Sequence, residues 1–154
     1  MDHVKVMIVD DEPDLRALAA LALTRLGKMD VITLSSGAEA VATATAESPD
    51  CILLDVMMPE ISGRETFARL RADNSTSGIP VIFLTGTTAV AEVESLKLLG
   101  ARAVLAKPFR PAALVEAVRA ATGVSPDGRW GREVERLKRD YIVNSGEKLE
   151  ILQR

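Results

Sequence analysis

Three carboxylates stand at the ends of short apolar runs, Asp10 and Asp11 after the first run and Asp55 after the third. If the runs are parallel strands of one sheet, these side chains meet at one edge, because sites in such sheets form at the carboxyl ends of the strands. Carboxylates held close together repel one another unless a cation compensates their charge. Oxygen ligands suit Mg²⁺ (or Mn²⁺), which takes one or two carboxylates and keeps several waters. With one His and one Cys, the chain offers no zinc-type cluster.

A nucleophile and two helper groups complete a site for phosphoryl transfer. With a divalent cation beside it, one carboxylate can attack phosphorus and form an aspartyl phosphate. Lys107 follows the fifth apolar run and brings a compact positive charge for a phosphoryl oxygen. Thr85 ends the fourth run and offers a hydroxyl to another oxygen. The residues therefore predict phosphoryl capture at this edge of the sheet.

Each of these residues also has an ordinary explanation when taken alone. An Asp pair after a strand often caps the next helix, because carboxylates accept hydrogen bonds from the free N–H groups at helix starts. A lone Thr85 is more often a cap, and a lone Lys107 is more often a solvated charge. We favour the phosphoryl interpretation because the residues stand together at the ends of four different apolar runs.

Five apolar runs alternate with five segments of helical periodicity. The runs are short, rich in Val, Ile or Leu and without polar alternation, which is typical of strands covered on both faces. The alternation predicts an α/β domain with a parallel sheet and right-handed crossovers. The predicted strands are residues 4–9, 31–34, 51–54, 80–84 and 103–106. The predicted helices begin near Pro13, Ser36, Gly63, Val90 and Pro111, with glycine stops at Gly27, Gly100 and Gly123.

Composition narrows the class of protein. Hydrophobic residues make up 47% of the 154 residues and aromatic residues only 3%, so Val, Ile, Leu and Ala must fill the core. The net charge is −3 and no basic block occurs, so direct nucleic-acid binding is not evident from the sequence. No apolar stretch is long enough for a bilayer and the start lacks a signal-peptide pattern, so a soluble, cytoplasmic protein is predicted. The single Cys51 rules out an intramolecular disulfide and is interpreted as a core residue.

The chemistry-bearing residues lie in motifs that resemble those of the receiver domain of two-component response regulators. The resemblance implies a doubly wound α/β fold, with a five-stranded parallel sheet of order 2-1-3-4-5 and helices on both faces. It also implies a phosphorelay function, in which a sensor histidine kinase or a histidine phosphotransfer protein donates the phosphoryl group and the product switches partner binding. Such a domain is not an enzyme beyond its own phosphorylation and dephosphorylation. The motifs are Val9–Pro13 (VDDEP), Leu53–Pro59 (LLDVMMP) with Gly63, Leu84–Gly86 (LTG) and Ala106–Phe109 (AKPF), within a match over residues 4–122.

The resemblance assigns a role to each acidic residue. Asp55 matches the phosphoacceptor. Asp11 and Asp55 match direct carboxylate ligands of the metal, and the backbone carbonyl of Met57 matches a third ligand. Asp10 matches a residue that acts through a metal-bound water.

The remaining positions include one departure from the family pattern. Thr85 and Lys107 match the phosphoryl-sensing hydroxyl and lysine, and the Lys107–Pro108 bond matches one that is usually cis. Val104 stands where many receivers carry an aromatic ring that moves inward, so a different relay route is expected. Met57 and Thr87 flank the site without an acid or amide to position water, which predicts slow loss of phosphate.

The last part of the chain differs in composition from residues 1–123, which are interpreted as the receiver. Residues 124–130 are rich in turn formers and predict a linker. Residues 131–154 predict an amphipathic helical extension, interpreted as the start of a truncated second module. Trp130 is interpreted as an anchor for this tail, and a homodimer is possible through the tail or the last helices.

Three alternatives compete with the receiver interpretation. An aspartate-nucleophile phosphatase of the haloacid-dehalogenase type typically carries a second Asp two residues after the nucleophile, where this chain has Met57. A nucleotide or flavin module needs a glycine-rich phosphate loop after the first strand, where residues 10–13 are acidic. A receiver-like scaffold without phosphorylation stays open because of Val104. The only histidine, His3, is expected to be exposed and not a phosphocarrier.

Overall fold

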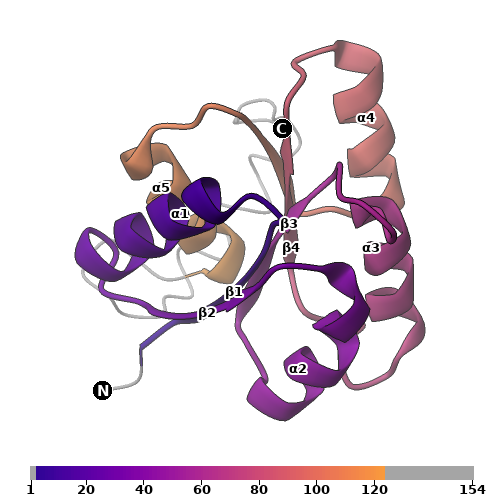
Figure 1. The fold of residues 1–154 in the computed structure, drawn as a ribbon, viewed down its shortest axis with the longest axis horizontal. Coiled ribbons are helices and arrows are strands. Elements are labelled where there is room, and N and C mark those ends of the chain that lie inside the picture. Colours follow the sequence, from indigo (N-terminus) through magenta and orange to yellow (C-terminus); the bar gives the residue numbers. More distant parts are fainter. Residues whose placement is uncertain (1–2, 124–154) are drawn as a thin grey trace. The chain divides into compact units, whose positions relative to one another are not determined.

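A five-stranded parallel sheet in the order β2-β1-β3-β4-β5 organises the protein, as expected (Figure 1). The computed structural model describes residues 3–123. The strands are β1 (Lys5–Val9), β2 (Asp30–Leu34), β3 (Cys51–Asp55), β4 (Val81–Thr85) and β5 (Ala103–Ala106). The helices are α1 (Pro13–Arg25), α2 (Ala40–Glu47), preceded by the 3-10 turn Gly37–Glu39, α3 (Gly63–Ala72), α4 (Val90–Leu99) and α5 (Pro111–Thr122).

The sheet has an apolar layer on each face, because successive strand residues point to opposite sides. On β1, Val6 and Ile8 pack beneath α1 and α5, whereas Met7 and Val9 pack beneath α2, α3 and α4 (Figure 1). Every residue of β3 and of β4 is buried. Cys51 is fully buried in the α1/α5 layer, which confirms its interpretation as a core residue.

Short polar signals begin the helices at the predicted places. The hydroxyl of Ser36 accepts a hydrogen bond from the Ala38 N–H at 3.2 Å, and the hydroxyl of Ser62 accepts one from the Glu65 N–H at 3.1 Å. Pro13 occupies the first turn of α1, where a missing N–H costs nothing. Gly100 ends α4 with a φ of 115°, a left-handed conformation that glycine adopts without strain.

The stop predicted at Gly27 has a different physical basis. The left-handed residue after α1 is Lys28, with a φ of 57°. A Cβ atom on Gly27 would stand 2.8 Å from the Leu23 carbonyl oxygen and 3.2 Å from the Met29 sulfur. Close packing, and not a left-handed turn, therefore explains this glycine.

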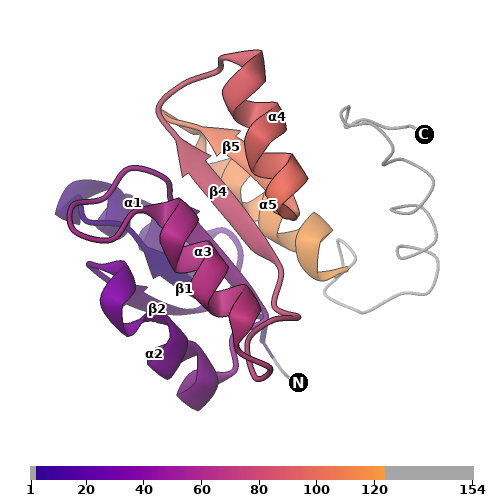
Figure 2. The ribbon, with the colours of Figure 1, turned by 90° about the vertical axis from the view of Figure 1, so that its right-hand side faces the viewer.

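The edges of the sheet are less covered than its centre. All four residues of β5 are half-buried, and β2 has two exposed positions. Figure 2 shows β4 and β5 with α4 on one side and α5 on the other. Within residues 3–123, no helix combines the length and the apolar character that a membrane crossing requires, and the cytoplasmic location stays a prediction. The linker over 124–130 with Trp130, and the tail over 131–154, lie outside the described residues.

Candidate functional site

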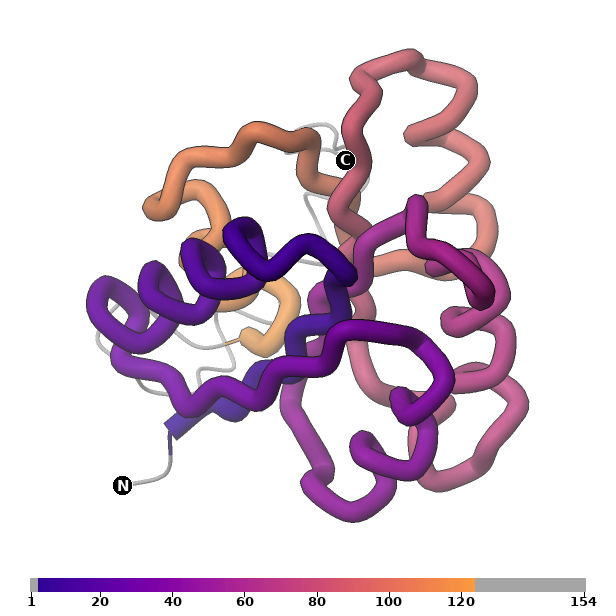
Figure 3. The backbone as a smooth tube through the Cα atoms, in the orientation of Figure 1, coloured from indigo at the N-terminus to yellow at the C-terminus, as the bar shows by residue number. Residues whose placement is uncertain are grey.

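The three acidic residues meet at the carboxyl ends of β1 and β3. Carboxylate oxygens of Asp10, Asp11 and Asp55 lie within 4.8 Å of one another. Asp10 is 1% exposed and Asp55 is 3% exposed, while Asp11 is half-buried. The tube in Figure 3 shows the turn after β1 beside the loop after β3, which explains how residues 45 positions apart come together. The predicted convergence of the carboxylates is therefore present.

Asp10 is fixed at several atoms. Its N–H donates to the Leu34 carbonyl oxygen at 3.1 Å, which extends the pairing of β1 with β2 by one residue. Its Oδ1 accepts from the Glu12 N–H at 2.9 Å, and its carbonyl oxygen accepts from Arg16 Nη1 at 2.8 Å. A buried carboxylate needs such partners, because an unpaired one loses several kcal/mol of solvation.

Asp55 is positioned by the end of β3 and by the start of α3. The next N–H, of Val56, donates to the Leu84 carbonyl oxygen of β4 at 3.0 Å. The Gly63 N–H returns to the Val56 carbonyl oxygen at 2.8 Å, and a Cβ atom on Gly63 would collide with the Asp55 carbonyl oxygen. Only glycine allows this close approach, which explains in physical terms why Gly63 belongs with the site motif.

Lys107 reaches the acidic cluster from the residue after β5. Its Nζ lies 3.0 Å from Asp55 Oδ1, 3.4 Å from Asp10 Oδ2 and 3.4 Å from Glu12 Oε1. Burial lowers the pKa of Lys107, but the hydrogen bond to Asp55 and the negative charges of Asp10 and Asp55 outweigh it, so the pKa is raised above its usual value. The Lys107 ammonium therefore stays charged beside the carboxylates.

The carboxyl group of Asp55 has a perturbed pKa. Burial raises its pKa from 3.8 to about 6. The hydrogen bond from Lys107 opposes this rise, whereas the nearby charges of Asp10 and Asp11 add to it. A strongly shifted pKa beside a specific charged partner is typical of functional sites.

Thr85 lies next to Lys107, but the hydrogen bond of the Thr85 side chain is to a residue of its own loop. The Lys107 N–H donates to the Thr85 carbonyl oxygen at 2.7 Å. The Thr85 hydroxyl, at a residue 3% exposed, accepts a hydrogen bond from the Thr87 N–H at 3.2 Å. The structure thus brings Thr85 to the correct edge of the sheet, with its hydroxyl engaged in the loop that leads to α4.

Two other predicted positions have contrasting environments. The side chain of Met57 is 77% exposed beside the site, in the loop that follows Asp55. Val104 is half-buried on β5 and packs against the α2/α3/α4 layer.

The Lys107–Pro108 peptide bond is cis, as expected. His3, with a side chain 55% exposed, lies 3.6 Å from Asp30, at the amino-terminal end of β2 and so at the end of the sheet opposite the site.

Sequence reasoning missed two charged residues that contact the site. Glu12 and Arg16 belong to the turn and first helical turn after β1, and they contact Lys107 and Asp10 respectively. Glu12 was only part of a motif, and Arg16 stands in a helix where a polar side chain is ordinary. No spacing pattern distinguishes them from solvated residues.

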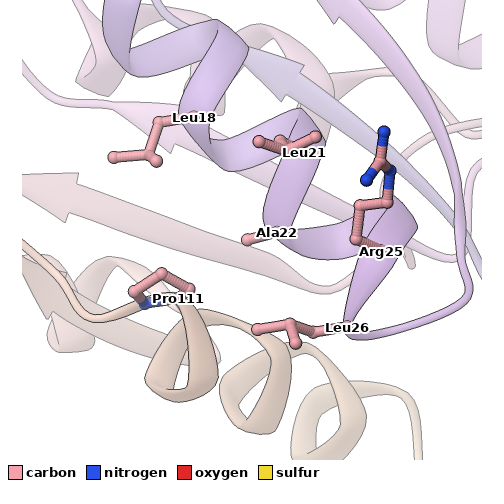
Figure 4. Close-up of a pocket in the computed structure, with 6 residues that line it drawn as sticks. All are labelled: Leu18, Leu21, Ala22, Arg25, Leu26 and Pro111. Atoms are coloured by element: carbon pink, nitrogen blue, oxygen red, sulfur yellow. The ribbon is translucent and has the colours of Figure 1, made fainter.

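A shallow apolar groove lies apart from the carboxylates, between α1 and the start of α5 (Figure 4). It has a volume of about 300 Å³. Leu18, Leu21 and Leu26 line it and are 43–55% exposed. Arg25 is its single charged residue, so the groove lacks groups for phosphoryl chemistry.

Comparison with known proteins agrees with this geometry. A family model described as response regulator receiver domain matches residues 6–119. The chain is 37% identical over 106 residues to the probable transcriptional regulatory protein TcrX of Mycobacterium tuberculosis, a match that covers 69% of the chain and 44% of TcrX. It is 32% identical to the chemotaxis protein CheY1 of Helicobacter pylori, over 79% of the chain and 99% of CheY1. The match thus spans less than half the length of TcrX but nearly all of CheY1.

Solved structures show the same fold. The chemotaxis protein CheY4 of Vibrio cholerae superposes with a TM-score of 0.72 at 31% identity, covering 78% of this chain and 99% of CheY4. The receiver domain of the sensor histidine kinase PA1611 of Pseudomonas aeruginosa superposes with a TM-score of 0.72 at 27% identity, covering 79% of this chain and 99% of that domain. The PA1611 structure is described with a magnesium ion coordinated in its active site cleft.

Fold and site together define a doubly wound α/β signalling domain with an acidic cluster at the carboxyl ends of its strands. The chain belongs to the response regulator receiver domain family. The pocket of Asp10, Asp11 and Asp55 is consistent with the phosphoacceptor site of such a domain. Membership of this family favours the receiver interpretation over the phosphatase and nucleotide-module alternatives.

Proposed function

We propose that Asp55 is the phosphoacceptor of this receiver and that Asp10, Asp11, Asp55 and the backbone carbonyl of Met57 hold Mg²⁺ (or Mn²⁺). The observation that supports this most strongly is the burial of two carboxylates in a cluster whose oxygens lie within 4.8 Å. Hard oxygen donors of this kind fit magnesium, and a receiver of the same fold has been solved with that ion. When bound, the cation neutralises charge on the transferring phosphoryl group and helps to align it.

The reaction moves a phosphoryl group from a phosphohistidine to a carboxylate oxygen of Asp55. The P–N bond of the donor breaks, a P–O bond to Asp55 forms, and the imidazole leaves with a proton taken from water. Asp55 must be ionised to attack, and the ammonium of Lys107 at 3.0 Å favours its ionised form. After transfer, Lys107 pairs with a phosphoryl oxygen and the Thr85 hydroxyl donates to another.

The donor is a sensor histidine kinase or a histidine phosphotransfer protein. His3, the one histidine of the sequence, is 3.6 Å from Asp30 at the far end of the sheet, so the phosphohistidine must come from elsewhere. In this proposal the domain catalyses only its own phosphorylation and dephosphorylation. The matches to the transcriptional regulators cover only about half of each regulator's length. These regulators therefore do not define the downstream effector of this chain.

Signal relay is proposed to run through the loop after β4. Val104 is half-buried and aliphatic, so it cannot make the inward swing of an aromatic ring. The Thr85 hydroxyl instead holds the Thr87 N–H, and the Thr87 hydroxyl holds the Ala89 N–H at 3.0 Å. Turning Thr85 toward a phosphoryl oxygen breaks the first of these bonds. The start of α4, at Val90, is then freed to move.

A small phosphodonor tests the acceptor assignment without a cognate kinase. The full chain is incubated with acetyl phosphate and Mg²⁺, and intact mass is measured for wild type, Asp55→Asn and Asp14→Asn. Asp14 is an exposed acid in the first turn of α1 and serves as the matched control. We expect one phosphoryl adduct on wild type and Asp14→Asn and none on Asp55→Asn. Equal adducts on all three proteins, or none on wild type, would refute the proposal and favour a scaffold role.

A further inference from the structure

We propose that Arg16 is a positioning residue, which holds the turn carrying Asp10 and Asp11 in the geometry that a divalent cation requires. This inference rests on the proposed function, because it concerns the same acidic cluster. Arg16 lies in the first turn of α1, and its side chain reaches back six residues. Its Nη1 donates to the carbonyl oxygen of Asp10 at 2.8 Å, in a partly buried contact.

Arg16 holds the carbonyl group of Asp10, which the other hydrogen bonds of Asp10 leave free to tilt. The Asp10 N–H is held by Leu34, and the carboxylate Oδ1 is held by the Glu12 N–H. The peptide plane between Asp10 and Asp11 is held at its carbonyl end by Arg16. Because that plane sets the direction in which Asp11 leaves the turn, Arg16 acts on Asp11 through the backbone.

The start of α1 lacks a capping hydrogen bond from the side chain of its N-cap residue. Glu12 is the N-cap residue of α1, yet its side chain makes no capping hydrogen bond and instead lies 3.4 Å from Lys107. Pro13 follows and has no N–H to donate. Two side-chain hydrogen bonds therefore hold this turn: Asp10 Oδ1 accepts from the Glu12 N–H, and Arg16 Nη1 donates to the Asp10 carbonyl oxygen.

The position of this turn matters for metal binding, because Mg²⁺ demands nearly ideal octahedral geometry. Groups that orient metal ligands without touching the ion change metal affinity strongly when removed. Arg16→Lys keeps one donor that can still reach the Asp10 carbonyl oxygen, whereas Arg16→Met removes the donor altogether.

Arg25 provides a matched control on the same helix. It is an exposed arginine in the last turn of α1, where it lines the apolar groove (Figure 4). Replacing Arg25 with Met removes the same charge and keeps the same aliphatic stem as replacing Arg16. The two variants differ in whether the side chain holds the turn after β1.

The experiment measures Mg²⁺ binding by isothermal titration calorimetry, and the initial rate of phosphorylation by acetyl phosphate as a function of Mg²⁺. Circular dichroism confirms that each variant is folded, and Arg16→Gln is a second neutral variant with the same expectation as Arg16→Met. We expect Arg16→Met to weaken Mg²⁺ binding about tenfold. The half-saturating Mg²⁺ concentration for phosphorylation shifts in parallel, whereas the rate at saturating Mg²⁺ stays within about twofold. Arg16→Lys, which keeps the charge and one donor, recovers most of the affinity, and Arg25→Met matches wild type.

Two results would overturn the inference. One is unchanged Mg²⁺ affinity in both neutral Arg16 variants, and the other is an equal loss in Arg25→Met. Either result leaves the proposed function intact as long as wild type binds Mg²⁺ and is phosphorylated. Absence of Mg²⁺ binding or of phosphorylation in wild type contradicts the proposed function instead.

Discussion

The two sides of the sheet edge differ in how tightly they are built. The capture side, formed by the ends of β1 and β3, contains Asp10 and Asp55 at 1% and 3% exposure. The relay side, formed by β5 and α4, has only Leu96 buried in its helix, and Val90 and Leu98 are 75% and 86% exposed. Regions with few buried apolar contacts open at lower free energy than the core. The residues proposed to bind the phosphoryl group are thus tightly held, while the part proposed to relay the signal is loosely packed.

This contrast has a local physical origin. On the capture side, the Asp10 carboxylate is held by the Glu12 N–H and by Lys107, and the Asp55 carboxylate is held by Lys107, so moving either acid leaves a buried charge without a partner. On the relay side, Thr85 is held in place by a 3.2 Å hydrogen bond within its own loop. In the proposed relay the hydroxyl donates to a phosphoryl oxygen, and the released Thr87 N–H, at an exposed residue, can bond to water, so the exchange costs little.

Replacing one glycine by alanine on each of the two sides should give the largest difference in unfolding free energy. A Cβ on Gly63 would collide with the Asp55 backbone, whereas a Cβ on Gly86 meets nothing within 4 Å. We expect Gly63→Ala to lower the free energy of unfolding by about 3 kcal/mol and to abolish phosphorylation. Gly86→Ala should change the unfolding free energy by less than about 0.5 kcal/mol. Urea denaturation of both variants measures the difference, and similar losses in the two variants would contradict the contrast.

Magnesium should stabilise the fold through the capture side. A ligand that binds only the native state adds about 3 kcal/mol at about a hundred times its dissociation constant. We expect this gain for wild type and its loss in Asp11→Asn, whose carboxylate belongs to the cluster. Thermal unfolding with Mg²⁺ and with a chelator measures it. A similar gain in both proteins would place the cation elsewhere.

The pH dependence of stability should report the buried charge of Asp55. Its pKa is raised from 3.8 to about 6 in the fold, so the ionised form is disfavoured there relative to the unfolded chain. The resulting destabilisation is full above about pH 6, declines as pH falls through the window down to 3.8, and is absent below it. In chelator, Asp55→Asn should therefore be more stable than wild type by about 3 kcal/mol at pH 7, and this advantage should shrink below pH 6. An advantage that is independent of pH would contradict this account.

The smallest expected effect is on the relay side. Arg64 of α3 and Glu92 of α4 form an ion pair at 3.0 Å, with side chains 36% and 31% exposed. Pairs this exposed contribute about 0–1 kcal/mol, so Glu92→Gln should hardly change global stability. It should speed amide hydrogen exchange in α4 without changing the phosphorylation rate. Unaltered exchange in α4 would show that the pair does not restrain the helix.

The sequence predicts the fold and the acidic cluster well because both follow from local patterns. Apolar runs mark the strands, and the ends of parallel strands must meet, so Asp10 and Asp55 could be placed together. The contact of Lys107 with Glu12 spans 95 residues and has no local signal. Arg16 was missed for a similar reason, since only the path of the turn after β1 shows which atom its side chain reaches. The Thr85 hydroxyl bond depends on loop geometry that residue types do not reveal.

Direct location of the phosphoryl group tests the central claim most sharply. After phosphorylation by acetyl phosphate with Mg²⁺, borohydride reduces an aspartyl phosphate to homoserine, which peptide mass mapping can locate. The account predicts homoserine at position 55 and no conversion of Asp10 or Asp11. Conversion at another acidic residue, or none in a protein that carries the phosphoryl adduct, would contradict the assignment of Asp55 as the acceptor.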